Sequence, residues 1–197
     1  MQSFCRWLAK KLGWTLVDNI PNEKRYVVIG YPHTSNWDFM LAMLFKFAVG
    51  FQFNWIAKHT LFFWPLGILM RALGGIGVDR ARTKGFIGEL ARAFQEHERM
   101  VLVITPEGTR GHTDCWRSGF YHLALSAEVP VVLGFVCFKT KRIGLGPMIH
   151  LSGDEEADLA KIREFYADKI GLYPELEGEI CFRPRPEPSN QTETKSD

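Results

Sequence analysis

The sequence lacks several features that would assign a chain to a class at once. No apolar run reaches the roughly 18 residues of a membrane-spanning helix, and the longest apolar stretch, residues 39–57, is interrupted by Lys46, Gln52 and Asn54. The charges nearly balance, with 24 basic and 22 acidic side chains, whereas a nucleic-acid-binding protein usually carries a concentrated basic face. We therefore expect neither a spanning helix nor a nucleic acid partner.

Cysteine is scarce and scattered. The four cysteines are Cys5, Cys115, Cys137 and Cys181. They form no C-x-x-C pair and no spacing typical of a zinc site, and a chain of 197 residues buries enough surface to be stable without disulfides. We expect free, mostly buried thiols in a reducing compartment, and no metal site.

The common cofactor and nucleophile motifs are missing as well. The sequence contains no G-x-S-x-G nucleophile elbow and no G-x4-G-K-[ST] phosphate loop, and the glycines of residues 74–80 lack the third glycine of a dinucleotide fingerprint. We therefore expect a protein that needs no cofactor and no serine nucleophile.

What the sequence does contain is an alternation of apolar runs and amphipathic stretches, which is typical of an α/β layered fold. Strands are predicted at residues 26–31, 53–57, 101–105, 129–138 and 143–151. Helices are predicted near residues 38–49, 60–73, 83–99 and 118–128, and after a capping box that begins at Ser152. Because the last two strands are joined by a short polar turn, we expect a mixed, mainly parallel central sheet flanked by helices.

The two ends of the chain differ from its centre. Residues 1–20 are predicted to hold an amphipathic helix, with Phe4, Trp7 and Leu12 at helical spacing and basic residues around them. Such a helix suits a membrane interface, and the alternative is a helix docked on the protein's own core. Residues 21–183 are expected to form the main domain. Residues 184–197 lack large apolar side chains and are expected to form a disordered polar tail.

A histidine and an aspartate follow the first predicted strand. His33 and Asp38 form an H-x4-D pair in a loop after residues 26–31. A carboxylate that orients a histidine holds it in one tautomer and leaves its other nitrogen free to accept a proton. The spacing alone is a short motif with false matches. The alternative role for Asp38 is to cap the following helix, and the two roles are compatible.

Basic groups follow two further strands. The block Glu107-Gly108-Thr109-Arg110 lies after residues 101–105, and its arginine offers a planar charged fork for a phosphate. Arg80 ends a further short strand, which is predicted within residues 74–80. Because loops at the carboxyl ends of parallel strands converge, we expect a His–Asp dyad that faces these arginines, with Arg117 nearby.

Four blocks, in this order, resemble the 1-acylglycerol-3-phosphate acyltransferase family, also called lysophosphatidic acid acyltransferases. HTSNWD (residues 33–38) matches the family's H-x4-D block, and GGIGVDR (74–80) looks like its second block. TPEGTRG (105–111) is similar to the F-P-E-G-T-R-S block, and EVPVVLGFV (128–136) to the V-P-hydrophobic block.

The resemblance implies transfer of a fatty acyl group from acyl-CoA or acyl carrier protein to the free hydroxyl of a lysophospholipid. The product would be phosphatidic acid if the acceptor is 1-acylglycerol-3-phosphate. By matching positions, His33 would be the general base and Asp38 its partner. The resemblance also implies a peripheral protein on the cytoplasmic face of a membrane.

The same resemblance assigns the acceptor's phosphate to Arg80 and Arg110, with Glu107, Gly108 and Thr109 shaping the pocket. The chain departs from the family pattern at Thr105, which replaces Phe, and at Gly111, which replaces Ser. Arg117 stands where Lys is frequent and keeps the charge with a different donor geometry. These departures leave the His33–Asp38 dyad intact and bear on the identity of the acceptor.

Three alternatives stay open on the sequence. The acceptor could be another lyso-lipid or an amino-lipid, the protein could bind lipid at a membrane surface without catalysis, or water could be the acceptor, as in a thioesterase. The apolar helices at 38–49 and 60–73 fit either an acyl-chain pocket or a membrane-facing surface, as well as ordinary core packing.

Overall fold

The structure is a computed structural model that describes residues 1–78 and 85–184. Its centre is a seven-stranded sheet in the order β1-β8-β7-β2-β5-β3-β4. The strands are β1 (Thr15–Asp18), β2 (Arg25–Tyr31), β3 (Asn54–Lys58), β4 (Gly75–Val78), β5 (Met100–Ile104), β7 (Val131–Cys137) and β8 (Arg142–Ile149). A second, two-stranded sheet pairs β6 (Cys115–Trp116) with β9 (Glu179–Phe182).

The sheet is mixed and mainly parallel, as the sequence predicted. β2 pairs in parallel with both β5 and β7, and β3 pairs in parallel with β5 and β4. The exception in this run is β8, which is antiparallel to β7 and carries β1 in parallel at the sheet edge. The carboxyl ends of β7, β2, β5, β3 and β4 therefore share one edge of the sheet.

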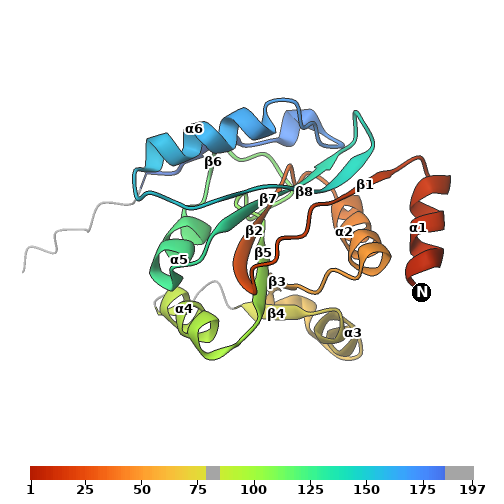
Figure 1. Ribbon diagram of the computed structural model, residues 1–197, viewed down its shortest axis with the longest axis horizontal. Helices are drawn as coiled ribbons and strands as arrows, with labels where there is room; N and C mark the ends of the chain where they lie inside the picture. Colours follow the sequence, from red (N-terminus) through yellow and green to blue (C-terminus); the bar gives the residue numbers. More distant parts are fainter. Residues whose placement is uncertain (79–84, 185–197) are drawn as a thin grey trace, which may run out of the picture.

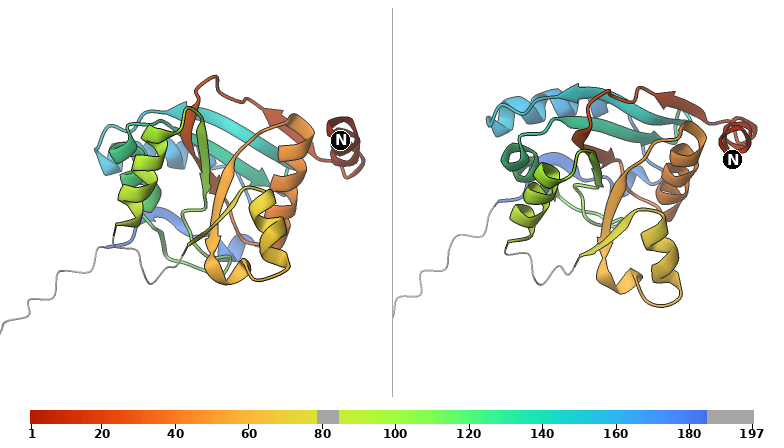
Figure 2. Two further views of the ribbon diagram at one scale, coloured as in Figure 1. Left: turned by 90° about the horizontal axis from the view of Figure 1, so that it is seen from below. Right: turned by 60° about the horizontal axis from the view of Figure 1, so that its bottom comes forward.

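Helices cover both faces of the sheet (Figure 1). They are α1 (Gln2–Lys11), α2 (Asn36–Val49), α3 (Leu66–Ala72), α4 (Phe86–Glu96), α5 (Gly119–Ala127) and α6 (Glu155–Tyr166), with 3₁₀ turns η1 (His59–Leu61) and η2 (Pro174–Leu176). Figure 2 shows α4 and α5 on one side of the sheet and α2 on the other. Successive residues of β2 serve the two faces: Val27 and Ile29 belong to the core of the first face, Tyr26 and Val28 to that of the second. A strand buried on both faces gives the continuous apolar run seen in the sequence.

The predicted helices at 60–73 and after Ser152 begin later than expected. Residues 59–61 form only a 3₁₀ turn, and α3 starts after Pro65, because proline fits the start of a helix but not its interior. The N-cap of α6 is Asp154, whose side chain accepts hydrogen bonds from the N–H groups of Glu156 and Ala157. Ser152 instead bonds the buried Asp158.

The N-terminal helix is shorter than the segment assigned to it. α1 ends at Lys11, and residues 15–18 form β1 of the central sheet. The helix packs on α2 through buried Cys5 and Ala9, while Phe4, Trp7 and Leu12 remain exposed. It therefore docks on the protein and still presents an apolar face outward. No helix in residues 1–78 or 85–184 is long and apolar enough to cross a membrane.

The expectation of four free thiols is wrong for one pair. Cys115 and Cys181 form a disulfide between β6 and β9, whereas Cys5 and Cys137 are free and buried. The two partners are 66 residues apart, and only the pairing of two short strands brings them together. The cysteines therefore no longer support a reducing compartment.

Candidate active site

Adjacent parallel strands bring two of the predicted motifs together. β2 and β5 are hydrogen-bonded neighbours, with Ile29 opposite Ile104 near their carboxyl ends. The loop after β2 carries His33, and the loop after β5 carries residues 105–111. The expected convergence at the carboxyl edge is therefore present for these two loops. Arg80, which was predicted to end a third strand, lies outside the described residues.

His33 and Asp38 face each other as the spacing predicted. His33 Nδ1 lies 3.1 Å from Asp38 Oδ2, and the histidine side chain is 19% exposed whereas the aspartate is buried. With a proton on Nδ1 the imidazole donates to the carboxylate, and its Nε2 lone pair is then available as a base.

Asp38 also caps the helix that follows it. Ser35 is the N-cap of α2 and accepts a hydrogen bond from the N–H of Trp37, while its own N–H donates to Asp38 Oδ2 at 2.8 Å. This reciprocal arrangement is a capping box. The two alternative roles considered for Asp38 therefore coexist, and the cap fixes the carboxylate that orients His33.

Glu107 lies behind the histidine loop and bonds the backbone. Its Oε2 accepts a hydrogen bond from the N–H of His33 at 2.8 Å, and its Oε1 accepts one from the N–H of Gly178 at 2.9 Å. The side chain is 1% exposed. Burial raises the pKa of Glu107 to about 7. The two N–H groups lower this pKa, but their effect is smaller than that of burial. Glu107 was expected to shape a phosphate pocket, and its two hydrogen bonds join the backbone of His33 to that of Gly178.

The remaining residues of the third block form an exposed turn. Gly108 has φ +66°, and a Cβ there would come within 3.0 Å of Arg117 Nε, so Arg117 packs closely over this glycine. Thr109 Oγ1 accepts a hydrogen bond from the N–H of Gly111 at 3.1 Å. Arg110 is exposed and lines the cavity described next.

An apolar cavity opens beside the dyad. It measures about 380 Å³, and its wall includes both His33 and Asp38. Most of its lining is apolar and comes from α2, from residues 53–61 and from α3, including Met40, Met43, Phe53, Trp55, Leu61 and Met70. Arg110 and the His33–Asp38 pair add charged groups to this lining. Such a site suits a ligand with an apolar chain and a polar end.

Several contacts of the histidine loop were not predicted. Thr34 Oγ1 accepts a hydrogen bond from the N–H of Tyr173 at 3.2 Å, and the Tyr31 hydroxyl donates to the carbonyl of Gly178 at 3.1 Å. No spacing rule connects residues so far apart in sequence. Among the described residues, no group of three or more His, Cys, Asp and Glu side chains is placed to hold a metal ion.

Comparison with known proteins indicates the family of the chain. The family model described as Acyltransferase matches residues 4–133. The chain is 30% identical over 141 residues to 1-acyl-sn-glycerol-3-phosphate acyltransferase alpha of Ovis aries, covering 65% of this chain and 48% of that protein. The chain thus spans about half the length of the curated relative it matches.

The fold is also that of a solved acyltransferase. The crystal structure of the 1-acyl-sn-glycerophosphate (LPA) acyltransferase PlsC from Thermotoga maritima superposes with a TM-score of 0.59 at 18% identity, covering 83% of this chain and 74% of the other. That likeness concerns the fold, whereas the family match includes both the His33–Asp38 pair and residues 105–111. From its matched sequence, which covers most of its length, this chain belongs to the acyltransferase family.

Proposed function

We propose that this protein is an O-acyltransferase that moves a fatty acyl group from a thioester, acyl-CoA or acyl carrier protein, to the free hydroxyl of a lysophospholipid. The preferred acceptor is 1-acylglycerol-3-phosphate, and the product is phosphatidic acid. One observation carries the proposal: the His33–Asp38 pair lies on the wall of an apolar cavity that also includes Arg110.

The reaction needs one base. His33 Nε2 takes the proton of the acceptor hydroxyl while Asp38 holds the proton on Nδ1. The oxygen attacks the thioester carbonyl, a C–O bond forms, and collapse of the tetrahedral intermediate breaks the C–S bond. The leaving thiolate takes the proton back from the imidazolium. A general base of this kind typically contributes about 10²–10⁴-fold to the rate.

The phosphate of the acceptor is assigned to arginine. Arg110 lines the same cavity as the dyad, and Arg117 packs over Gly108, two residues before Arg110. A guanidinium binds phosphate in a planar, bidentate way. Arg80 keeps its assignment as a phosphate ligand from the resemblance alone.

A membrane surface is the proposed source of the lipid substrates. Met40 and Leu61 line the cavity and are also 57% and 44% exposed, so the apolar surface continues from the cavity to the outside. Beyond Leu61 the chain exposes Phe63, Trp64, Ile68 and Leu69. We propose that this surface rests on the bilayer as a peripheral contact, together with the exposed face of α1.

A panel of acceptors tests the proposal. Purified protein is incubated with acyl-CoA or acyl carrier protein and with lysophosphatidic acid, other lyso-lipids, an amino-lipid or water alone. Phosphatidic acid should be the fastest product, and Arg110→Ala should slow the phosphate-bearing acceptors at least about tenfold more than neutral ones, since a charge-assisted bond is lost. Equal effects on all acceptors would contradict the phosphate assignment. Release of free fatty acid alone would indicate a thioesterase.

A further inference from the structure

The C-terminal segment, residues 171–183, packs against the histidine loop, residues 31–35. The N–H of Tyr173 donates to Thr34 Oγ1 at 3.2 Å, and the carbonyl of Gly178 accepts a hydrogen bond from the Tyr31 hydroxyl at 3.1 Å. Thr34 and Tyr31 are both buried. The segment lies outside residues 4–133, which the family model matches, so the family match assigns it no role.

A third contact runs through Glu107. One carboxylate oxygen accepts from the N–H of Gly178 in the segment, and the other accepts from the N–H of His33 in the loop. The backbone of the histidine is thus joined to the C-terminal segment by a single buried side chain. A displacement of Gly178 removes one of the two bonds that hold Glu107 under His33.

The fit at Gly178 is close. A Cβ at this position would come within 2.6 Å of Thr113 Cγ2 and 2.8 Å of the Thr113 carbonyl oxygen. Both atoms belong to the chain just before β6, and Thr113 is buried. The C-terminal segment therefore passes so close to Thr113 that only glycine fits at position 178.

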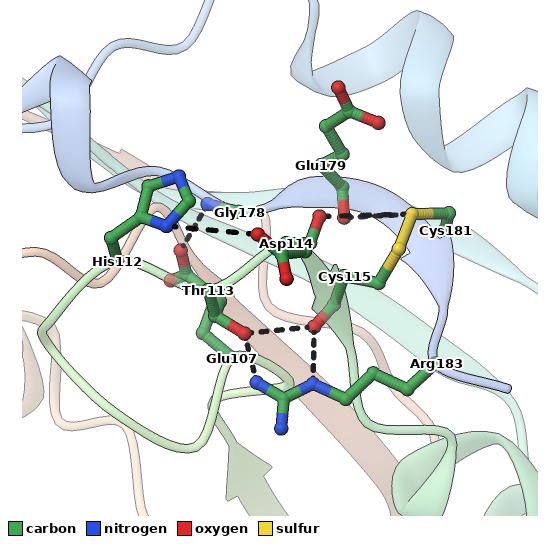
Figure 3. Close-up of polar contacts among 9 residues, drawn as sticks. All are labelled: Glu107, His112, Thr113, Asp114, Cys115, Gly178, Glu179, Cys181 and Arg183. Carbon is green, nitrogen blue, oxygen red and sulfur yellow. Dashed lines mark hydrogen bonds and ion pairs between the residues drawn. A yellow bond between two sulfur atoms is a disulfide. The ribbon is translucent and has the colours of Figure 1, made fainter. Parts of the chain in front are cut away.

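The segment is tethered by β9. Figure 3 shows the Cys115–Cys181 disulfide between β6 and β9, with the Arg183 side chain reaching the carbonyl of Cys115 and Thr113. β6 has two residues and β9 four, and the pair packs on the core through the buried Trp116 and through Phe182. The disulfide is the covalent link in this pairing, and both of its cysteines are half-buried, so a reductant can reach it.

We propose that the C-terminal segment positions His33 for catalysis through Glu107, and that reduction of the Cys115–Cys181 disulfide releases the segment and lowers turnover. This inference rests on the proposed acyl transfer for its kinetic readout. The step is balanced by a dithiol: the S–S bond breaks, the two cysteines gain two electrons and two protons, and the dithiol becomes a disulfide.

The kinetic test compares oxidised and reduced protein. The chain is treated with dithiothreitol, the reductant is removed by desalting, and the two new thiols are confirmed by alkylation and mass spectrometry. We expect kcat for acyl transfer to fall at least about tenfold, because small misplacements of a catalytic group are costly. The KM values for donor and acceptor should change less than about twofold, and reoxidation should restore kcat.

Two variants separate positioning from general stability. Gly178→Ala displaces the segment while leaving the disulfide intact, and it should lower kcat in the same way. Glu175→Ala, an exposed change within the segment, is the matched control and should behave as the wild type. Cys115→Ser/Cys181→Ser should match the reduced protein and no longer respond to dithiothreitol.

Amide hydrogen exchange tests the positioning of the histidine loop without an assay of acyl transfer. In oxidised protein the N–H of His33 is bonded to Glu107, so a peptide that includes residues 31–35 should exchange slowly. Reduction should speed its exchange at least about tenfold while peptides from β5 and β7 stay protected. Unchanged exchange, or a fully reduced protein with wild-type kcat, overturns the inference. An oxidised protein that is inactive with every acceptor, yet shows the exchange change, refutes the proposed function and not the positioning.

Discussion

At the scale of residues, one carboxylate oxygen connects helix formation to chemistry. Asp38 Oδ2 accepts bonds from the N–H of Ser35 and from His33 Nδ1. The turn that starts α2 therefore fixes the orientation of the imidazole. The sequence was enough to pair these two residues, because both lie in one short loop after a strand. It did not reveal the bonds of Glu107, whose partner Gly178 is 71 residues away.

Asp38→Asn tests the orientation of the histidine. The amide oxygen can take the place of Oδ2 and keep both of its bonds, from the Ser35 N–H and from His33 Nδ1, but it carries no negative charge to stabilise the imidazolium that forms when Nε2 takes the proton. We expect kcat for acyl transfer to fall by about 10²–10⁴-fold, with KM nearly unchanged and the free energy of unfolding within about 1 kcal/mol of the wild type. A rate within threefold of the wild type would contradict the dyad.

Glu107 gives the stability of the protein a pH dependence. Burial raises its pKa from 4.5 to about 7, helped by the neighbouring charges of Glu177 and Asp38. The folded state then holds a proton that the unfolded chain releases, so the contribution of Glu107 to stability is complete below about pH 4.5 and is lost as the pH rises through about 7.

The comparison with Glu107→Gln isolates this effect, since Gln does not titrate. Between about pH 5 and pH 8 the free energy of unfolding of the wild type should fall relative to the variant by roughly 2–3 kcal/mol. Urea unfolding at both pH values measures it. Parallel pH profiles for the two proteins would show that the buried carboxyl does not titrate in this range.

At the scale of elements, the unusual feature is the set of exposed apolar side chains on and around η1 and α3. Trp64 is 81% exposed and Ile68 is 62% exposed. The sequence predicted a helix over the whole of 60–73 but could not say which of its side chains would be buried, because the helix lies at the β4 edge of the sheet and not over its face.

Trp64→Ala/Ile68→Ala tests the membrane contact. Burial of such side chains contributes about 1.5–3 kcal/mol each, so the fraction bound to anionic phospholipid vesicles in a sedimentation assay should fall at least about tenfold. Trp7→Ala reports separately on α1. Leu125→Ala, on α5 at the other face of the sheet, is the matched control. Acyl transfer to a short-chain acceptor dispersed in water should be retained, and unchanged vesicle binding would assign this surface to another partner.

At the scale of the whole molecule, the sequence predicted the parts that depend on local patterns. The buried strands, the order of helices and the meeting of His33 with residues 105–111 follow from apolar runs and from the geometry of parallel strands. β1, β6 and β9 were missed because they are short and belong to none of the four sequence blocks, whereas the equally short β4 lies in the block GGIGVDR. The disulfide was missed for the same reason, since it joins two of these strands.

The disulfide also affects global stability. The two cysteines are 66 residues apart in sequence, so the disulfide restricts the unfolded chain. In the chain-entropy account, a cross-link over a loop of this size stabilises the folded state by about 4 kcal/mol. Cys115→Ser/Cys181→Ser should therefore lower the free energy of unfolding by roughly 2–4 kcal/mol in urea titration. Cys137→Ser removes a buried thiol without removing the cross-link and serves as the comparison. Equal stability of the wild type and the double variant would contradict the cross-link.

The central claim is that His33 removes the proton of the acceptor hydroxyl. The most direct test is the initial rate of phosphatidic acid formation from lysophosphatidic acid and a thioester donor, measured for oxidised wild type and for His33→Ala with matched folding by circular dichroism. The account predicts acyl transfer by the wild type and a rate about 10²–10⁴-fold lower in the variant. Diacyl product formed equally fast by both proteins, or by neither with any donor, would contradict it.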